Sequence, residues 1–315
     1  MKVLIYGAGA VGLGIASCLL KAGAKVSIFA RPETVKSLRQ NGLVRTGIFG
    51  SLTASPQRFT ASASLEDFAN GAYDFILVCT KCYDTAYAAA ELDEHRRLLS
   101  PTGVIVLFQN GWGNAEIFNA RFPKEKIYSA RVITGFTRLQ LHHVEITVHA
   151  DAIHIGSLFA DPLSTVEPLA AAINAGGIPC ITTAEIEKDL WAKMLYNCAL
   201  NPLGAILDVP YGALAESPDT REIMNTIIEE IYAVMTAAGF HTHWNTAKQY
   251  EEVFYNKLVP PTALHRSSTL QDLKMGKKTE IDALTGQILK LAAPSHIPTP
   301  CNAILYRLIQ FLQNK

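Results

Sequence analysis

The first half of the chain alternates between short apolar runs and segments whose apolar residues recur at helical spacing. The runs at residues 2–6 and 25–30 are typical of strands that are buried on both faces of a parallel sheet. Between them, residues 11–23 have helical spacing and end at a glycine. Residues 73–81 and 103–111 form two further apolar runs, and each leads into polar residues. The alternation predicts βαβ units.

The pattern changes further along the chain. A helix is expected through residues 84–99, and short strands with close turns between 127 and 156 indicate an antiparallel extension of the sheet. After a helix at 165–175 and a strand at 178–183, helical spacing occupies four segments: 185–200, 220–239, 267–293 and 299–313. We therefore predict an α/β fold, with a Rossmann-type, NADP-binding domain over residues 1–180 and an all-α substrate domain over residues 181–315.

Composition and charge exclude several classes of protein. The 315 residues are 49% hydrophobic, enough for two cores, and 28 basic residues balance 28 acidic ones, which argues against a nucleic-acid partner. No apolar run reaches the roughly 18 residues of a membrane span, and no apolar leader precedes the first strand. The six scattered cysteines are typical of reduced thiols. We expect a cytoplasmic protein with no membrane partner.

A glycine-rich turn joins the first strand to the first helix. Its six residues fit the pattern G-x-G-x-x-G: Gly7, Ala8, Gly9, Ala10, Val11 and Gly12. The first glycine permits the tight turn, the second lets the backbone approach a pyrophosphate, and the third allows the helix to pack closely on the strand. In this context we predict a dinucleotide site; the alternative is an ordinary glycine-rich turn.

Arg31 follows the second strand, where NAD-binding proteins usually carry an acidic residue for the ribose hydroxyls. A guanidinium can instead make a two-pronged contact with the 2′-phosphate of NADP. An arginine at this position therefore predicts that the cofactor is NADP(H) rather than NAD(H). A surface arginine that pairs with Glu33 is the alternative.

Three polar residues share one face of an otherwise apolar helix. Lys193, Asn197 and Asn201 are spaced i, i+4 and i+8, so their side chains lie above one another. Burying an ammonium group and two amides without hydrogen-bond partners is costly. We therefore expect these groups to hydrogen-bond to one another, to other parts of the protein or to a ligand. A polar stripe at the helix surface is the alternative.

Long motifs along the whole chain resemble ketopantoate reductase (2-dehydropantoate 2-reductase), a family of the 6-phosphogluconate dehydrogenase-like superfamily. They are "GAGAVG", "TK" at 80–81, "QNG" at 109–111, "LWAKMLYNCALNPLGAI" and "SSTLQDLKMGKKTEID". The resemblance implies NADPH-dependent reduction of a small 2-keto acid, ketopantoate, in pantothenate and coenzyme A biosynthesis.

The resemblance also implies roles for individual residues. Lys193 is the general acid that protonates the keto oxygen, and Glu280 interacts with this lysine and with the nicotinamide side of the cofactor. Asn110 lies between cofactor and substrate, and Lys81 lies near the cofactor. Substrate-binding roles fall to Asn110, Lys193, Asn197, Asn201 and Ser268. Without the resemblance, Glu280 would be one more solvated charge.

Reduction of a ketone by hydride with a lysine as general acid also agrees with general chemical principles, apart from the resemblance. Hydride that reaches a ketone leaves negative charge on oxygen, which a nearby ammonium can stabilise and then protonate. Asparagines recognise a hydroxyl without adding charge. Two alternatives stay open: a related NADP-dependent reductase of a different 2-keto acid or imine, and a non-catalytic NADP-binding sensor.

The chain departs from the family pattern at positions that are expected to determine which substrate fits the site. Tyr211 and His265 stand where asparagine is common, and Phe136, in a loop, replaces a small residue.

Cys79 and Cys82 form a C-x-x-C pair, which alone is a weak signal for a metal or a redox site, so we expect no metal. The "GKK" run at 276–278 is expected on a helix surface. A homodimer is one assembly that the chain could form.

Overall fold

The computed structural model describes residues 1–69, 71–159 and 161–315. Two compact units account for them. The first contains residues 1–109 and 114–186, and the second contains residues 110–113 and 187–315. A short segment from the first half of the sequence thus belongs to the helical unit. That the first unit binds NADP and the second binds substrate stays a prediction.

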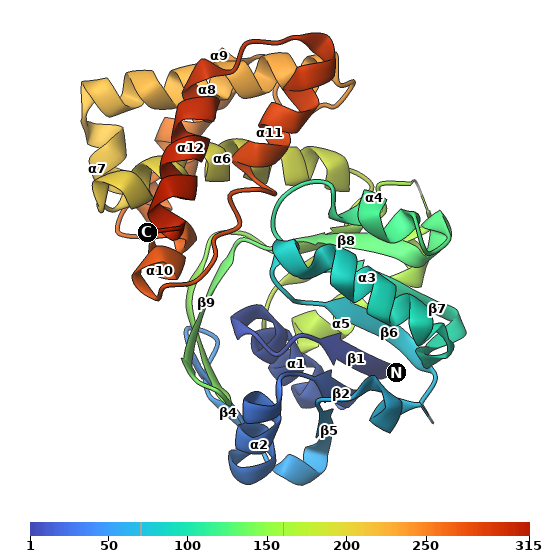
Figure 1. The fold of residues 1–315 in the computed structure, drawn as a ribbon. Helices are drawn as coiled ribbons and strands as arrows, with labels where there is room; N and C mark the ends of the chain where they lie inside the picture. The colour runs from blue at the N-terminus through green and yellow to red at the C-terminus, as the bar shows by residue number, and fades with distance from the viewer. Residues whose placement is uncertain (70, 160) are drawn as a thin grey trace. The chain divides into compact units, whose positions relative to one another are not determined.

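The first unit is built on an eight-stranded sheet of order β12-β11-β8-β7-β6-β1-β2-β5 (Figure 1). Neighbouring strands from β8 to β5 run parallel, and β11 is antiparallel to β8. The strands are β1 (Lys2–Tyr6), β2 (Lys25–Phe29), β5 (Phe59–Ser62), β6 (Tyr73–Val78), β7 (Leu99–Leu107), β8 (Ile127–Arg131), β11 (Ile153–Gly156) and β12 (Cys180–Thr182). Because β2 and β6 flank β1, the chain reverses its direction of winding at β1, where ligands of such sheets bind.

Side chains of β1 alternate between two hydrophobic cores. Val3 and Ile5 pack with helices α1 (Ala10–Lys21), α2 (Pro32–Asn41) and α5 (Glu167–Ala175). Leu4 and Tyr6 pack with α3 (Thr85–Glu94) and α4 (Asn114–Asn119), and Figure 1 shows α3 in front of the sheet and α4 beside β8. Burial on both faces explains why these strands are continuously apolar. The predicted Rossmann-type fold is confirmed.

The predicted antiparallel extension is confirmed for β11, which pairs antiparallel with β8, but a separate four-stranded sheet of order β4-β3-β10-β9 corrects the rest of the prediction. Its strands are β3 (Leu43–Gly47), β4 (Leu52–Ala54), β9 (Thr134–Gln140) and β10 (His143–His149). β10 pairs in parallel with β3, and the sheet contacts α1. For β9 and β10 the prediction was wrong because β3 and β4 were not foreseen, so the two strands had no other predicted partners. Phe136 and Arg138 consequently lie in β9, not in a loop.

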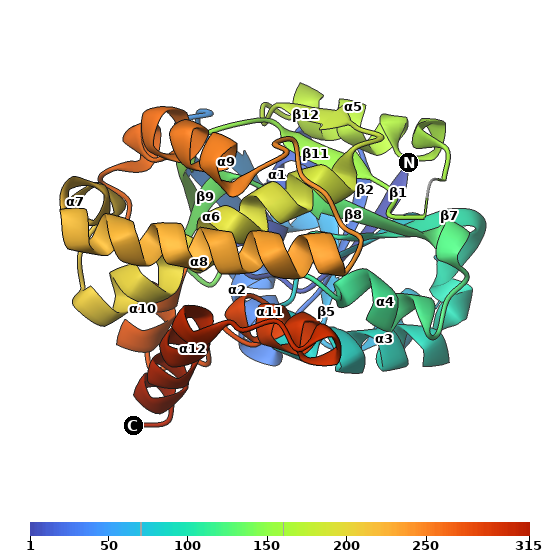
Figure 2. The same ribbon diagram turned by 90° about the horizontal axis from the view of Figure 1, so that it is seen from above.

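The second unit consists of helices and turns. Its helices are α6 (Ile186–Leu207), α7 (Tyr211–Glu216), α8 (Pro218–Ala237), α9 (Ala247–Val253), α10 (Ser268–Lys274), α11 (Thr285–Ala292) and α12 (Pro300–Gln313). Figure 2 shows α8 lengthwise, and it contacts α7, α9, α11 and α12. A single π-helical turn, Phe254–Leu258, follows α9 and ends just before the two prolines at 260 and 261. In the described part of the chain, no helix has the length and apolar character that crossing a membrane requires.

Residues 267–293 are not helical throughout, contrary to the prediction. α10 ends at Lys274, and Gly276 adopts a φ of 62°, which is left-handed and terminates the helix. The "GKK" run therefore lies in a loop, where Lys278 pairs with Asp282 at 3.6 Å. Past this run the chain turns inward, so that Glu280 is only 6% exposed. The helix break is what brings this carboxylate into the interior.

Candidate active site

The glycine turn has the geometry that its sequence predicts. Gly7 follows β1 with a φ of 103°, and a side chain there would collide with Thr80. A side chain at Gly12 would overlap the carbonyl oxygen of Gly7. At Gly9, in contrast, an added Cβ would lie 3.9 Å from the nearest heavy atom, the carbonyl oxygen of Cys79. The first and third glycines are thus required by the turn, and the second leaves open space.

That open space adjoins the start of α1. Gly9 is the N-cap of the helix, and having no side chain it gives the first-turn N–H groups no capping acceptor. Ala8 is buried, whereas Ala10 and Val11 are half-buried. A helix N-terminus of this kind binds anions through its N–H groups and the positive end of the helix dipole. The turn therefore fits the pyrophosphate of a dinucleotide.

Arg31 lies at the N-cap of α2, directly after β2. Its side chain is 76% exposed, and its Nε lies 3.3 Å from Oε1 of Glu33. The residue is therefore accessible to a ligand at this end of the strand. The ion pair with Glu33 is the competing interaction that the sequence already suggested.

A second guanidinium near Arg31 was not predicted. Arg138 on β9 donates from Nη2 to Oγ1 of Thr34 at 2.8 Å and to the carbonyl oxygen of Leu141 at 3.1 Å. Burial, and then the positive charge of Arg31, lower the pKa of Arg138. Two cationic groups thus approach each other beyond β2. Finding Arg138 from the sequence would have required knowing that β9 belongs to the smaller sheet beside α1.

Lys81 and the C-x-x-C pair lie in the loop after β6. A Cβ on Gly12 would lie 3.2 Å from the side chain of Cys79, which shows that this loop adjoins the glycine turn. Lys81 is half-buried and caps a short 3₁₀ turn, Cys82–Asp84. Burial raises the pKa of the Cys79 thiol, which disfavours the reactive thiolate.

Three predicted site residues form one hydrogen-bonded chain in the second unit. Nζ of Lys193, from α6, donates to Oδ1 of Asn110 at 2.6 Å. Nδ2 of Asn110 donates to Oε2 of Glu280 at 3.0 Å. Lys193 and Asn110 are half-buried and Glu280 is buried. An ammonium group, an amide and a carboxylate therefore meet, although they come from three distant parts of the sequence.

Aromatic packing holds the segment that carries Asn110. The indole of Trp112 lies 4.9 Å from the rings of both Trp191 and Phe240, measured between ring centroids. The backbone N–H of Trp112 donates to the carbonyl oxygen of Ala283 at 3.0 Å. Gly111 has a φ of 87° and passes so close to Ala283 that a side chain would collide with it. This anchoring explains why residues 110–113 belong to the helical unit.

The two predicted asparagines continue the polar face of α6. Asn197 is half-buried, and Asn201 is 3% exposed. The hydroxyl of Tyr211 donates to Oδ1 of Asn201. The spacing of the stripe therefore placed these residues correctly on one helix, but the sequence did not predict a hydrogen bond from Tyr211 to one of them.

Ser268 is the first residue of α10 and is half-buried. The neighbouring Ser267 is buried, and its Oγ accepts a hydrogen bond from the backbone N–H of Leu270 at 3.0 Å. Ser267 thus caps the helix. Of the two adjacent serines, Ser268 is the one whose hydroxyl is not used as the cap.

An acidic residue on the same helix face was also missed. Asp189 lies one turn before Lys193 and is 7% exposed. Its Oδ1 lies 2.8 Å from Nε2 of His243. The i, i+4 spacing from Lys193 could have revealed Asp189, whereas His243 is distant in sequence.

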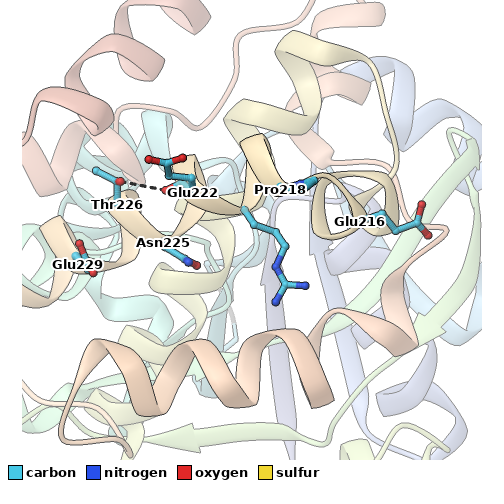
Figure 3. Close-up of a pocket in the computed structure, with 7 residues that line it drawn as sticks. Glu216, Pro218, Glu222, Asn225, Thr226 and Glu229 are labelled. Carbon is cyan, nitrogen blue, oxygen red and sulfur yellow. Dashed lines mark hydrogen bonds between the residues drawn. The ribbon is translucent and has the colours of Figure 1, made fainter.

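A surface groove on the second unit lies apart from these groups. It is lined by Glu216 at the end of α7 and by six residues of α8: Pro218, Arg221, Glu222, Asn225, Thr226 and Glu229 (Figure 3). Arg221 stacks on the ring of Tyr255, 4.0 Å from its centroid. None of the predicted site residues lines this groove, so we do not assign it to the reaction.

Family descriptions match both halves of the chain. "Ketopantoate reductase PanE/ApbA" matches residues 3–159, and "Ketopantoate reductase PanE/ApbA C terminal" matches residues 185–313. The chain belongs to the ketopantoate reductase family. Ketopantoate reductases are NAD(P)-dependent oxidoreductases, and the resemblance inferred from the motifs is confirmed.

Individual relatives extend over the full length of the chain. It is 35% identical to 2-dehydropantoate 2-reductase of Aquifex aeolicus (strain VF5), with 98% of this chain and 96% of the relative covered. A ketopantoate reductase structure from Ralstonia eutropha JMP134 is 30% identical, has a TM-score of 0.85 and covers 100% of this chain and 99% of its own. D-mandelate dehydrogenase, in a ternary structure with NADH and anilino(oxo)acetate, is 21% identical, has a TM-score of 0.89 and covers 100% of this chain and 98% of its own. It shares the fold.

Proposed function

We propose that this protein reduces ketopantoate to pantoate with NADPH, with Lys193 as the general acid, in pantothenate and coenzyme A biosynthesis. Family membership supports the reaction. The observation that carries the mechanism is the chain of hydrogen bonds from Lys193 through Asn110 to Glu280. A stripe of solvated polar residues would not require a buried carboxylate at its end.

Glu280, Asn110 and Lys193 have different roles in the proposed mechanism. A carboxylate can only accept hydrogen bonds, so Glu280 makes the amide of Asn110 present its nitrogen to Glu280 and its oxygen to Lys193. The amide oxygen then fixes the position of the ammonium group. When bound, the reduced nicotinamide supplies hydride to the keto carbon. The ammonium of Lys193 stabilises the negative charge that develops on the keto oxygen and donates a proton to it.

For the cofactor, we propose NADP(H) rather than NAD(H). The open space at Gly9 and the uncapped start of α1 would take the pyrophosphate. Arg31 would bind the 2′-phosphate, and Arg138 supports this assignment because a dianionic group would relieve the repulsion between the two guanidinium groups. Lys81, Asn110 and Glu280 complete the proposed contacts to the cofactor.

For the substrate, we propose that Ser268 binds near the carboxylate of the keto acid. Asn197 and Asn201 would hold its hydroxyl end, because amides can bond a hydroxyl without adding charge. Asn110 and Lys193 would face the keto group. A homodimer stays a prediction that a measurement of molecular mass in solution would test.

The experiment that tests the proposed function follows NADPH oxidation with ketopantoate as the substrate. We expect kcat to fall by about 10²–10⁴-fold in Lys193→Ala, because a positioned general acid contributes a factor of that order. Lys188→Ala is the matched control, since it removes a lysine from another side of α6 and should leave kcat nearly unchanged. Equal rates in the two variants would disprove the role of Lys193, and no oxidation by the wild type would disprove the reaction.

A further inference from the structure

The two departures from the family pattern in the helical unit are in contact with each other. The rings of Tyr211 and His265 lie 5.4 Å apart between centroids, with an interplanar angle of 62°. The backbone N–H of Tyr211 also donates to the carbonyl oxygen of His265 at 3.0 Å. The two replacements therefore form one repacked wall and are not independent changes.

A hydrogen bond joins this wall to the polar face of α6. The hydroxyl of Tyr211 donates to Oδ1 of Asn201, and each of the two residues is 3% exposed. Burial raises the pKa of Tyr211 far above neutral pH, so the phenol keeps its proton and remains a donor. An asparagine at position 211 would not fix the neighbouring amide in this way, because its side chain can either donate or accept.

The other end of the Asn201 amide has no hydrogen-bond partner among the described residues. Within the part of the chain that the structure describes, its Nδ2 donates no hydrogen bond. This nitrogen is not among the fully buried side-chain atoms that lack a partner, so it keeps some accessibility although the residue as a whole is buried. The neighbouring hydroxyl of Tyr196 does not compete for this nitrogen, because it is hydrogen-bonded to Oγ1 of Thr262 at 2.5 Å. An accessible amide donor that no described residue accepts from is therefore available to a ligand.

We propose that Tyr211 is a specificity-determining residue that holds Asn201 with its amide nitrogen toward the substrate. The site then selects 2-keto acids that carry a hydrogen-bond acceptor, such as a hydroxyl oxygen, at the end remote from the keto group. This inference rests on the proposed reduction of a 2-keto acid by the same unit. Tyr211 acts through Asn201 and does not need to contact the substrate.

Tyr211→Phe tests this inference, because it keeps the ring and removes the donor. Ketopantoate would be compared with 3,3-dimethyl-2-oxobutanoate, which has the same carbon skeleton without the terminal hydroxyl. We expect KM for ketopantoate to rise about tenfold with kcat nearly unchanged, and the constants for the analogue to stay the same. The preference for ketopantoate would therefore fall about tenfold.

Tyr196→Phe is the matched control. It removes a hydroxyl from the same aromatic cluster, where the two tyrosine rings lie 5.9 Å apart, but that hydroxyl bonds Thr262 and not Asn201. The control should keep the wild-type preference between the two keto acids. The inference is overturned if both variants keep that preference, or if Tyr211→Phe lowers kcat equally for both substrates.

A measurement without turnover separates this inference from the proposed function. In protein labelled with [¹⁵N]asparagine, the side-chain amide signal of Asn201 can be assigned by its loss in Asn201→Asp. We expect this signal to shift in Tyr211→Phe and to stay in place in Tyr196→Phe. If the wild type reduced neither keto acid, the proposed function would fail while this result could still stand. If the signal stays in place in a folded Tyr211→Phe variant, Tyr211 does not orient the Asn201 amide, and the inference is wrong.

Discussion

The ammonium nitrogen of Lys193 lies 2.6 Å from Oδ1 of Asn110, although 83 positions separate the two residues in the sequence. The same amide donates to Glu280 at 3.0 Å. Because the carboxylate cannot donate, it determines which end of the amide faces the lysine. Asn110 is therefore the group through which Glu280 positions the proposed acid.

The first prediction concerns Asn110 itself. In Asn110→Ala the ammonium of Lys193 loses the amide acceptor at 2.6 Å, and we expect kcat for ketopantoate to fall by about 10²-fold, because misplaced catalytic groups cost factors of that order. Asn119→Ala, an exposed change at the end of α4, is the control. Steady-state kinetics and a thermal melt would be measured for both variants. Unchanged kcat in a folded Asn110→Ala would show that the lysine does not need the amide.

The second prediction concerns the coupling between Glu280 and Asn110. A glutamine can donate or accept, so Glu280→Gln no longer fixes the orientation of the amide, and kcat should fall about tenfold or more. In an Asn110→Ala background the same change should cost less, because the part of its effect that passes through the amide is already gone. The four proteins form a double-mutant cycle. Additive losses would mean that Glu280 acts independently of Asn110.

The third prediction concerns Trp112, which packs on Trp191 and Phe240. Truncating a buried tryptophan costs about 3–5 kcal/mol of stability, and Trp112→Ala should also lower kcat because Asn110 lies two residues away. Trp112→Phe should restore most of both. Urea unfolding and kcat would be measured, with Trp244→Ala as the control. Lost stability with unchanged kcat would separate the packing from the position of Asn110.

Local patterns predicted the elements and one face of the site. The apolar runs predicted β1, β2, β6 and β7, and the i, i+4, i+8 spacing placed Lys193, Asn197 and Asn201 on a single face of α6. Both inferences depend only on the period of a helix or a strand, which a sequence displays directly. The family motifs then added Asn110, Glu280 and Ser268, which periodicity alone would not have selected.

Features that depend on distant pairing were not predictable in this way. The smaller sheet requires β10 to pair with β3, and paired residues such as Val44 and His143 are 99 positions apart, so no local pattern reveals the pairing. The transfer of residues 110–113 to the helical unit depends on the packing of Trp112, and the role of Arg138 depends on where β9 lies. The bond from Tyr211 to Asn201 likewise follows from tertiary packing.

The fourth prediction concerns the choice of cofactor. Arg31→Ala and Arg138→Ala should each weaken NADPH binding by about tenfold or more, because a hydrogen bond to a charged group is worth about 1.5–3 kcal/mol. NADH has no 2′-phosphate, so its affinity should change little. Fluorescence titration of the enzyme with each nucleotide measures both constants. Lys36→Ala, an exposed cation on α2, is the control. A parallel loss of NADH affinity would contradict the assignment.

The last prediction concerns pH and His265. Burial lowers the pKa of His265 below its usual 6.5, so the folded protein resists protonation of this ring more than the unfolded chain does. Its contribution to stability is therefore complete above about pH 6.5 and is lost as the pH falls through the folded pKa, with a slope of at most about 1.4 kcal/mol per pH unit. His265→Asn, which cannot titrate in this range, should reduce that slope. Urea unfolding between neutral and mildly acidic pH would measure it. Because His142 and His149 also have lowered pKa values, part of the slope should persist, and an identical slope in the variant would exclude His265 as a contributor.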